Sequence, residues 1–331
     1  MQIANRTKAC HMKKRLFVLS FSLILIWGCE NNSPIPVEKD QKGNENYAGP
    51  VIDMHIHAYN GEIGGMMFGM DHPNPLKNEV YKGVKTPEEQ KSETFKKFAE
   101  NNIVLALTSD GQIWDEGESD RILISGRNMP LDSLRQMAEA GSISAIGELN
   151  PFYGGITADH PSQKPYFDLA EEFNLPVGFH IMPGGPPGGI YHFGMNKVRV
   201  RNANPKQLEE VLVSHPKMKI YIMHGGWPYL EDMKAMMYAH PQLYIDIAAI
   251  DWILPEAEFH SFLKGLVDAG FGKRIMFGSD QMVWPETIDI AVDAVNSADF
   301  LTPEQKEDIF FNNAARFLNL PEERINKLKA S

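Results

Sequence analysis

The sequence has 331 residues, of which 43% are hydrophobic and 23% charged, as expected of a soluble globular protein. Its formal net charge of −11 argues against a nucleic-acid partner, because binding to phosphates requires clustered Lys and Arg. The two cysteines, Cys10 and Cys29, both lie near the start, which excludes a cysteine zinc site or a cysteine nucleophile from the rest of the chain.

The first 29 residues are typical of a signal peptide. A basic KKR segment precedes residues 16–27, an apolar run of 12 residues that is shorter than the ~20 residues needed to span a bilayer. The run ends in LIWGC, which resembles a bacterial lipoprotein cleavage site and predicts lipidation of Cys29; an ordinary signal peptide or an uncleaved anchor is the alternative. Residues 30–49 are polar and rich in Asn, Pro and Gly, as in a flexible tether. We therefore expect an exported protein, lipid-anchored to a membrane of the cell envelope and facing the periplasm or the cell surface.

Short apolar runs alternate with amphipathic helical stretches between residues 50 and 320, and residues 321–331 remain as a C-terminal tail. The runs are rich in Ile, Val, Leu and Phe, as expected of parallel strands buried on both faces. Eight strand–helix units predict an α/β fold, a single (β/α)8 TIM barrel. A doubly wound open sheet is the alternative, but no glycine-rich dinucleotide motif follows the first run. The predicted strands are residues 51–57, 103–109, 121–125, 143–149, 176–181, 219–224, 243–249 and 274–278.

Several helix ends are also recognisable. Thr86 followed by Pro87 and two glutamates predicts a helix start with a capping side chain. Apolar residues recur at helical spacing over residues 259–267, which predicts one buried helix face. Gly141 and Gly270 follow predicted helices, where a left-handed residue often ends the helix.

Polar side chains cluster at the carboxyl ends of the predicted strands. Asp53, His55 and His57 alternate on the first strand and therefore point the same way. Active sites of this fold form at that end of the barrel. Each residue alone has a structural explanation; Asp280, for example, is placed to cap the helix near Pro285. Together they predict one site. The other strand ends contribute Glu148, His180, His224 and Asp280 to it.

His and carboxylate ligands without cysteine suit zinc, or a similar divalent ion, in an open catalytic site. This pattern resembles the amidohydrolase superfamily over about residues 50–320, including the closing NNAARFL segment at 312–318. The segments MHGG (223–226) and FGSD (277–280) are most similar to the branch that also holds aromatic-acid decarboxylases and lactonases. The resemblance implies Asp280 as the proton-transferring catalytic group, and His224 as a catalytic group that holds water or polarises a carbonyl. The metal ligands that it implies are His55, His57, His180 and Asp280.

Glu148 leaves open whether one or two ions bind. Some superfamily members have a carboxylate on the fourth strand that bridges two metals, and His180 and His224 would then hold the second ion. Others use one metal, and the fourth strand contributes nothing. The segment AIGE (145–148) is similar to the bridging kind, so Glu148 is included among the predicted ligands; a buried salt bridge or a helix cap is the alternative.

Two long segments, residues 59–85 and 182–205, are predicted to shape the substrate pocket. The second contains Arg199 and Arg201, which alternate with valines and so predict one face of an extended segment. Guanidinium groups bind carboxylates in bidentate fashion, which predicts a carboxylate-bearing substrate; a solvated loop that pairs with surface acids is the alternative. Candidates for apolar contact with the ligand are Tyr191, His192 and Trp227.

Three functions remain open at this point. We expect hydrolysis of a small-molecule amide, ester or lactone by metal-activated water. The second is non-oxidative decarboxylation of an aromatic or dienoic acid with the same metal. The third is a metal-binding or substrate-binding lipoprotein without turnover. The Asp53-x-His55-x-His57 form favours hydrolysis, because decarboxylating relatives often begin this motif with Glu. An acidic barrel of this size is also compatible with a homodimer.

Overall fold

The computed structural model describes residues 45–330, except residues 63, 109–113, 115–120, 128, 186 and 193. The predicted signal peptide, with Cys29, and the tether up to residue 44 therefore lie outside the described residues. No helix within the described ranges is long and apolar enough to cross a membrane.

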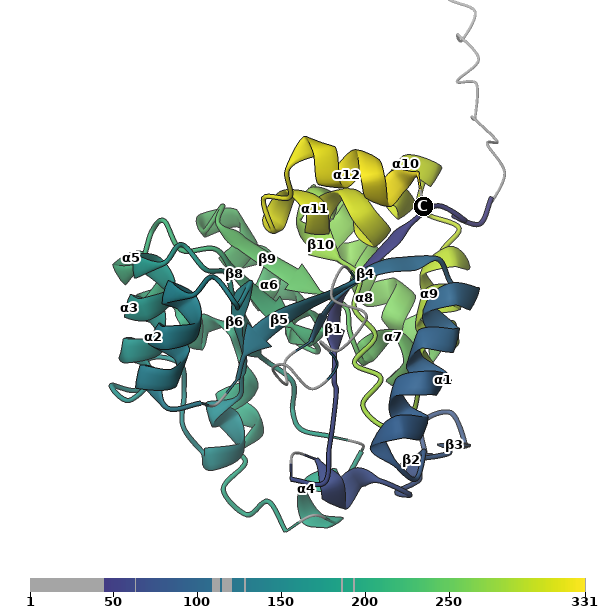
Figure 1. Cartoon of the computed structure of the whole chain (residues 1–331), viewed down its shortest axis with the longest axis horizontal. Coiled ribbons are helices and arrows are strands. Elements are labelled where there is room, and N and C mark those ends of the chain that lie inside the picture. Colours follow the sequence, from purple (N-terminus) through teal and green to yellow (C-terminus); the bar gives the residue numbers. More distant parts are fainter. Residues whose placement is uncertain are drawn as a thin grey trace, which may run out of the picture. The chain divides into compact units, whose positions relative to one another are not determined.

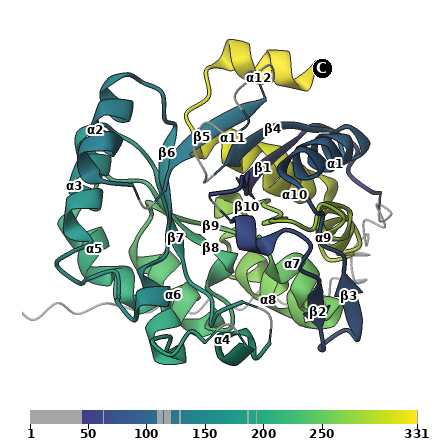
Figure 2. The same cartoon turned by 60° about the horizontal axis from the view of Figure 1, so that its bottom comes forward.

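Eight parallel strands form the centre of the fold, in the order β1-β4-β5-β6-β7-β8-β9-β10 (Figures 1 and 2). The first strand and the segment after the last one are joined by hydrogen bonds from Met54 N to Phe277 O and from Asp280 N to His55 O. The predicted TIM barrel is therefore confirmed, and each predicted strand overlaps one that is observed. Their bounds are β1 Val51–Ile56, β4 Ile103–Thr108, β5 Ile122–Gly126, β6 Ala145–Leu149, β7 Val177–His180, β8 Ile220–Met223, β9 Leu243–Asp246 and β10 Ile275–Met276.

Helices cover the outside of the barrel, with α2, α3 and α5 on one side and α1, α7 and α9 on the other (Figure 1). The predicted apolar face of residues 259–267 lies on α8, where Phe259, Phe262, Leu263 and Leu266 are buried. Apolar side chains between strands and helices thus form the main core. The helix bounds are α1 Pro87–Glu100, α2 Leu131–Glu139, α3 Lys164–Glu172, α4 Gly189–His192, α5 Glu209–Ser214, α6 Leu230–Ala239, α7 Ile250–Ile253, α8 Glu256–Asp268 and α9 Thr287–Asn296.

The predicted helix ends are confirmed. The side chain of Thr86 accepts a hydrogen bond of 3.1 Å from Glu89 N at the start of α1. Gly141 and Gly270 have positive φ angles of 64° and 89° after α2 and α8. The capping alternative for Asp280 is wrong, because α9 begins at Thr287 with Glu286 at its N-cap.

Residues outside the predicted barrel boundaries pack against it. Tyr47, at the end of the predicted tether, stacks on Phe310 with ring centroids 5.3 Å apart, and its amide donates to Asn296 Oδ1. The predicted C-terminal tail forms helix α12 (Glu322–Lys329), whose Leu328 is buried in a cluster with barrel residues. Residues on both sides of the predicted bounds 50–320 thus pack against the barrel.

The remaining elements are short. Within the predicted pocket segment 59–85, strands β2 (His72–Asn74) and β3 (Glu79–Tyr81) form an antiparallel hairpin that the sequence did not predict. The closing NNAARFL segment lies beside the barrel, where Asn313 Nδ2 donates to Ile275 O. The other elements are the 3-10 helices Gly65–Met67, Pro151–Gly154, Val200–Ala203, Pro205–Leu208, His224–Gly226 and Gly272–Arg274, helix α10 Pro303–Glu307, the π-helix Asp308–Asn312 and helix α11 Asn313–Phe317.

Candidate metal centre

His55 and His57 project from the end of β1 with their rings 5.2 Å apart. The buried carboxylate of Asp53 holds this strand end, because its Oδ1 accepts from both His55 N and Ser279 N at 3.0 Å. His57 N donates in turn to Gln281 Oε1 at 3.0 Å. Both ring nitrogens of His55 are buried without a hydrogen-bond partner among the described residues. Nδ1 faces Asp246 Oδ2 at 3.3 Å, which leaves Nε2 as the nitrogen that can bind an ion.

Asp280 follows β10 and faces both histidines of β1. Its Oδ1 lies 2.9 Å from His57 Nε2 and 3.5 Å from His55 Nε2. Asp280 has a φ of 51°, which is unfavourable for a residue with a side chain and costs of order 1–3 kcal/mol. The closure bond from Asp280 N to His55 O fixes this conformation. The structure thus brings together His55, His57 and Asp280, which the sequence placed at the ends of the first and last strands.

Glu148, at the end of β6, lies between two groups of histidines. Its Oε1 lies 2.5 Å from His180 Nδ1 and 3.8 Å from His224 Nε2. Its Oε2 lies 3.9 Å from His57 Nε2. Glu148 therefore belongs to two sets of side chains that are close enough to hold an ion, one with His55 and His57 and the other with His180 and His224.

The backbone before Glu148 explains why glycine precedes it. Gly147 has a φ of 151°, and a Cβ at this position would lie 2.7 Å from the carbonyl oxygen of Gly178 on β7. The Ser125 hydroxyl also donates to Gly147 O at 2.7 Å. Glycine at 147 thus lets β6 approach its neighbour closely enough to deliver the carboxylate.

His180 and His224 come from the ends of β7 and β8 and are in contact, with His224 Nε2 3.0 Å from His180 Nδ1. His224 Nδ1 lies 3.0 Å from Ala248 O, which holds the ring in place. Like Asp280, His224 has a positive φ, here 62°. His180 Nε2 is buried without a hydrogen-bond partner among the described residues, and the Tyr153 ring lies 5.1 Å from the His180 ring.

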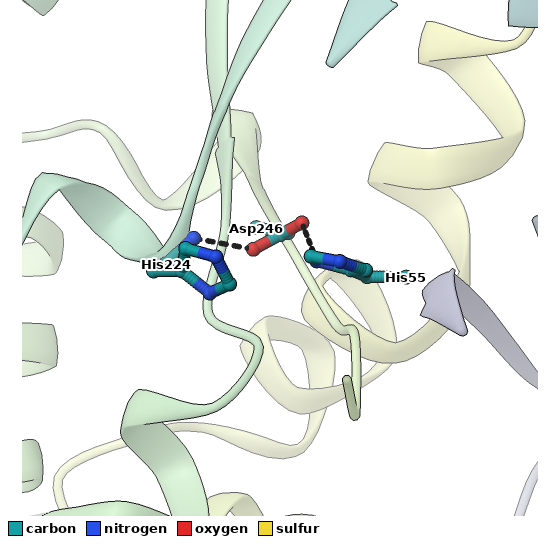
Figure 3. A group of neighbouring side chains, drawn as sticks. All are labelled: His55, His224 and Asp246. Atoms are coloured by element: carbon teal, nitrogen blue, oxygen red, sulfur yellow. Dashed lines mark hydrogen bonds and ion pairs between the residues drawn. The ribbon is translucent and has the colours of Figure 1, made fainter. Parts of the chain in front are cut away.

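Asp246 on β9 is a site residue that the sequence reasoning missed. It lies between His224 and His55 (Figure 3), accepting from His224 N at 2.8 Å and placing its Oδ2 3.3 Å from His55 Nδ1. These three side chains form a third group able to hold an ion. The available signal was a single carboxylate inside the apolar run of residues 243–249, where a buried charge needs a partner.

Arg127, directly after β5, was also missed. Its guanidinium lies 3.6 Å from Glu148 Oε2 and 3.4 Å from His57 Nδ1. The side chain remains 24% exposed, so it reaches the centre from the solvent side. The sequence signal was weak, since the strand predicted at 121–125 ended two residues before this arginine.

The charges of the centre are strongly coupled. Burial raises the pKa of Glu148, but hydrogen bonds with His180 and His224 outweigh it and bring that pKa well below its ordinary value. Burial likewise lowers the pKa of His224, but Glu148 and the charge of Asp280 outweigh it, and this pKa rises to about 9. The pKa of Asp280 is lowered because the attraction of His55 and His57 exceeds the effect of burial. Glu148 and Asp280 thus remain ionised although both are buried.

This donor set fits a divalent metal ion. It combines imidazole nitrogens, including His55 Nε2 and His180 Nε2, neither of which has a hydrogen-bond partner among the described residues, with carboxylates that stay ionised. Nitrogen and oxygen ligands of this kind bind zinc, manganese and similar ions. A bound cation would also offset the buried negative charge, which is otherwise costly.

The predicted arginines of the second pocket segment lie elsewhere. Arg199 donates to the backbone carbonyls of Asn196 and Val198, and both Arg199 and Arg201 are exposed. The predicted extended segment is wrong, because Val200–Ala203 is a 3-10 helix, in which alternate residues do not share a face. Their contact with substrate stays a prediction.

The structure is a TIM barrel with side chains placed to hold a metal ion, and comparison with known proteins gives the family. The Amidohydrolase family model matches residues 52–320, so the chain belongs to the Amidohydrolase family. Protein fluG of Emericella nidulans is 21% identical over 145 residues, which cover 39% of this chain. The match spans only 17% of that longer protein.

Solved structures of similar fold include a probable 2-pyrone-4,6-dicarboxylic acid hydrolase from Acinetobacter baumannii with citric acid bound, at a TM-score of 0.55 and 14% identity. A 5-carboxyvanillate decarboxylase from Novosphingobium aromaticivorans with bound manganese has a TM-score of 0.56 and 12% identity. An amidohydrolase from Burkholderia multivorans with bound zinc has a TM-score of 0.55 and 13% identity. The similarity covers 82% of this chain and 99%, 97% and 100% of theirs, and supports the barrel fold.

Proposed function

We propose that this chain is a metal-dependent hydrolase of a small-molecule ester, lactone or amide that carries a carboxylate. The observation that carries the proposal is the position of Glu148, which is shared by the His55–His57 group and the His180–His224 group. A shared carboxylate between two sets of imidazoles suits a pair of ions. The residues that would hold them are His55, His57, Glu148, His180, His224 and Asp280.

A divalent ion in such a centre supplies water of lowered pKa, ~7 in place of 15.7, and polarises a carbonyl. Asp280 is suited to accept a proton, because its Oδ1 already lies 2.9 Å from His57 Nε2 and its low pKa keeps it anionic. It can later deliver that proton to the leaving group. With two ions bound, His224 would be a ligand of the second ion. With one ion bound, it would instead orient the scissile carbonyl, its ring held by Ala248 O.

The carboxylate of the substrate would bind Arg127. Its guanidinium is partly exposed and lies beside Glu148 and His57, whereas Arg199 is occupied by carbonyls of its own loop. A guanidinium can hold a carboxylate with two parallel hydrogen bonds. The acid-binding proteins of similar fold, with citric acid or a nitrobenzoic acid bound, are consistent with an anionic substrate.

Decarboxylation of an aromatic or dienoic acid is the second candidate. Arg127 favours it specifically, because this side chain would place a substrate carboxylate directly beside the metal groups. Some of the proteins with the same fold are decarboxylases. Carbon dioxide release from candidate acids separates the two reactions.

The first experiment measures bound metal in the purified chain by plasma mass spectrometry, together with hydrolysis of an ester, lactone and amide panel. About two ions per chain, and turnover that disappears on chelation and returns with zinc or manganese, would support the proposal. Carbon dioxide release without hydrolysis would support the second candidate. Absence of metal, with no rescue by added ions, would refute both.

We also propose that the chain is exported and lipid-anchored through Cys29, on the basis of its LIWGC segment. Palmitate labelling of the wild type and of Cys29→Ser tests this. Labelling of the wild type alone would support the anchor, and equal labelling would refute it.

A further inference from the structure

A cavity of about 330 Å³ opens on the catalytic face of the barrel. Its described lining includes no charged side chain. Met182, Ile253 and Leu254 form a buried inner wall, and Leu76, Tyr191 and Val200 form an exposed rim. Cavities of roughly 300–1,000 Å³ with apolar walls are typical of small-ligand sites.

The cavity is built by the same loops that carry the metal centre. Met182 follows His180 by two residues, and Trp227, another lining residue, follows His224 by three. Ile253 and Leu254 lie at the end of α7, which follows β9 and its Asp246. The cavity is therefore lined by the loops that follow the strands of the metal centre.

The exposed rim also requires an explanation. Leu76 is 48% exposed, Val200 50% and Tyr191 85%, and they converge on one opening although they come from distant parts of the chain. Clustered exposed apolar side chains usually mark a binding site, whereas isolated ones are common. The metal centre, which the same loops carry, is charged, with Arg127, Glu148 and Asp280. The two regions together match a ligand with one apolar and one polar end.

We propose that this cavity is a subsite for the apolar acyl group of the substrate, so that the enzyme acts on amphipathic esters or amides. The proposal rests on the proposed function for the chemistry at the polar end. The acyl group lies against Met182, Trp227 and Ile253, while the scissile bond lies at the metal centre.

Binding of straight-chain carboxylates from butanoate to decanoate to the metal-loaded chain tests this subsite without requiring turnover. We expect the dissociation constant to fall about fourfold for each methylene group that enters the cavity, until it is full. Titration calorimetry measures it. A dissociation constant that does not change with chain length would overturn the subsite.

Gly185→Leu should block the cavity. Gly185 lines it, and a Cβ added there would meet no heavy atom within 4 Å, so the substitution begins in open space. We expect at least tenfold weaker decanoate binding and unchanged butanoate binding. Gly272→Leu is the matched control, since a Cβ there also meets nothing and the residue precedes β10 at the other end of the barrel.

A second pair covers the case in which Gly185→Leu does not fold. Tyr191→Glu places a negative charge at the rim, and Tyr238→Glu does the same on α6 at an equal exposure of 85%. Weaker decanoate binding in the first variant alone supports the subsite, and equal behaviour of the two overturns it. Chain-length-dependent binding without hydrolysis of any acyl ester would instead refute the proposed function and leave the subsite standing.

Discussion

Replacing Glu148 with Gln is the sharpest test of the metal centre. The amide has nearly the shape of the carboxylate, so the contact of 2.5 Å with His180 can persist as a hydrogen bond. What disappears is one negative charge that lies within 4 Å of side chains in both ligand groups. We expect the chain to lose its bridged pair of ions and keep at most one.

The size of the effect follows from the distances. Two unit charges ~4 Å apart interact by about 4 kcal/mol at an effective dielectric constant of ~20. Glu148 Oε1 lies 3.8 Å from His224 Nε2, so a divalent ion at a similar distance from the carboxylate loses about twice this attraction, ~8 kcal/mol. If rearrangement recovers half of this, about 4 kcal/mol remain, which weakens ion binding roughly 1,000-fold.

Metal content and hydrolysis rate are measured on the wild type, Glu148→Gln and Glu172→Gln. Glu172 is the matched control, because it is half-exposed and pairs with Arg135 on the outer helices α2 and α3. Two ions falling to one, with lost turnover, is the expected result. Unchanged metal content and rate in Glu148→Gln would refute the bridging role and return this residue to a structural salt bridge.

Three further predictions follow from individual contacts. Arg127→Gln should raise KM for a carboxylate substrate by ~10–100-fold with metal content unchanged, since a hydrogen bond to a charged group contributes ~1.5–3 kcal/mol; equal KM values would exclude Arg127 as the anchor. Burial of His72 lowers its pKa from 6.5 to about 4, so the folded chain binds fewer protons than the unfolded chain between these pH values. About 3 kcal/mol of stability present above pH 6.5 should therefore be lost as the pH falls toward 4. Urea unfolding should detect a smaller loss in His72→Phe, and identical pH profiles would contradict this. Thr86→Ala should lower the free energy of unfolding by ~0.5–2 kcal/mol through loss of the α1 cap, whereas no change in the same assay would mean that α1 frays without cost.

The barrel was predictable because its signals are local. Residues close together in the sequence are enough to predict the eight apolar strands, the Thr86 cap and the buried helix face around Phe259. The common direction of His55 and His57 was also predictable, since side chains alternate along a strand. Each of these features can be predicted without knowing which strands lie next to each other in the folded protein.

The parts that were missed depend on contacts between distant segments. Asp246 stands out in the sequence as a carboxylate within an apolar strand, but its partners are known only when β9 places it beside His55 and His224. Arg127 reaches Glu148 from another strand, and nothing in its own neighbourhood indicates this. The β2–β3 hairpin likewise depends on tertiary contacts, such as the bond from Asn74 Nδ2 to Ile253 O.

The hydrogen bonds that close the barrel also hold residues of the centre in place. Asp53 ties His55 N to Ser279 N, and Asp280 N donates to His55 O, so the bonds that join the first strand to the last segment also aim two predicted ligands. These residues are more than 220 positions apart in the chain, as the separation of 226 between Asp53 and Ser279 records. An ion that binds only the closed barrel must therefore stabilise it, by an amount set by its concentration relative to its dissociation constant. The unfavourable φ of Asp280 is sustained by this closure, which explains why the strain lies at the seam of the barrel, where the ion would bind.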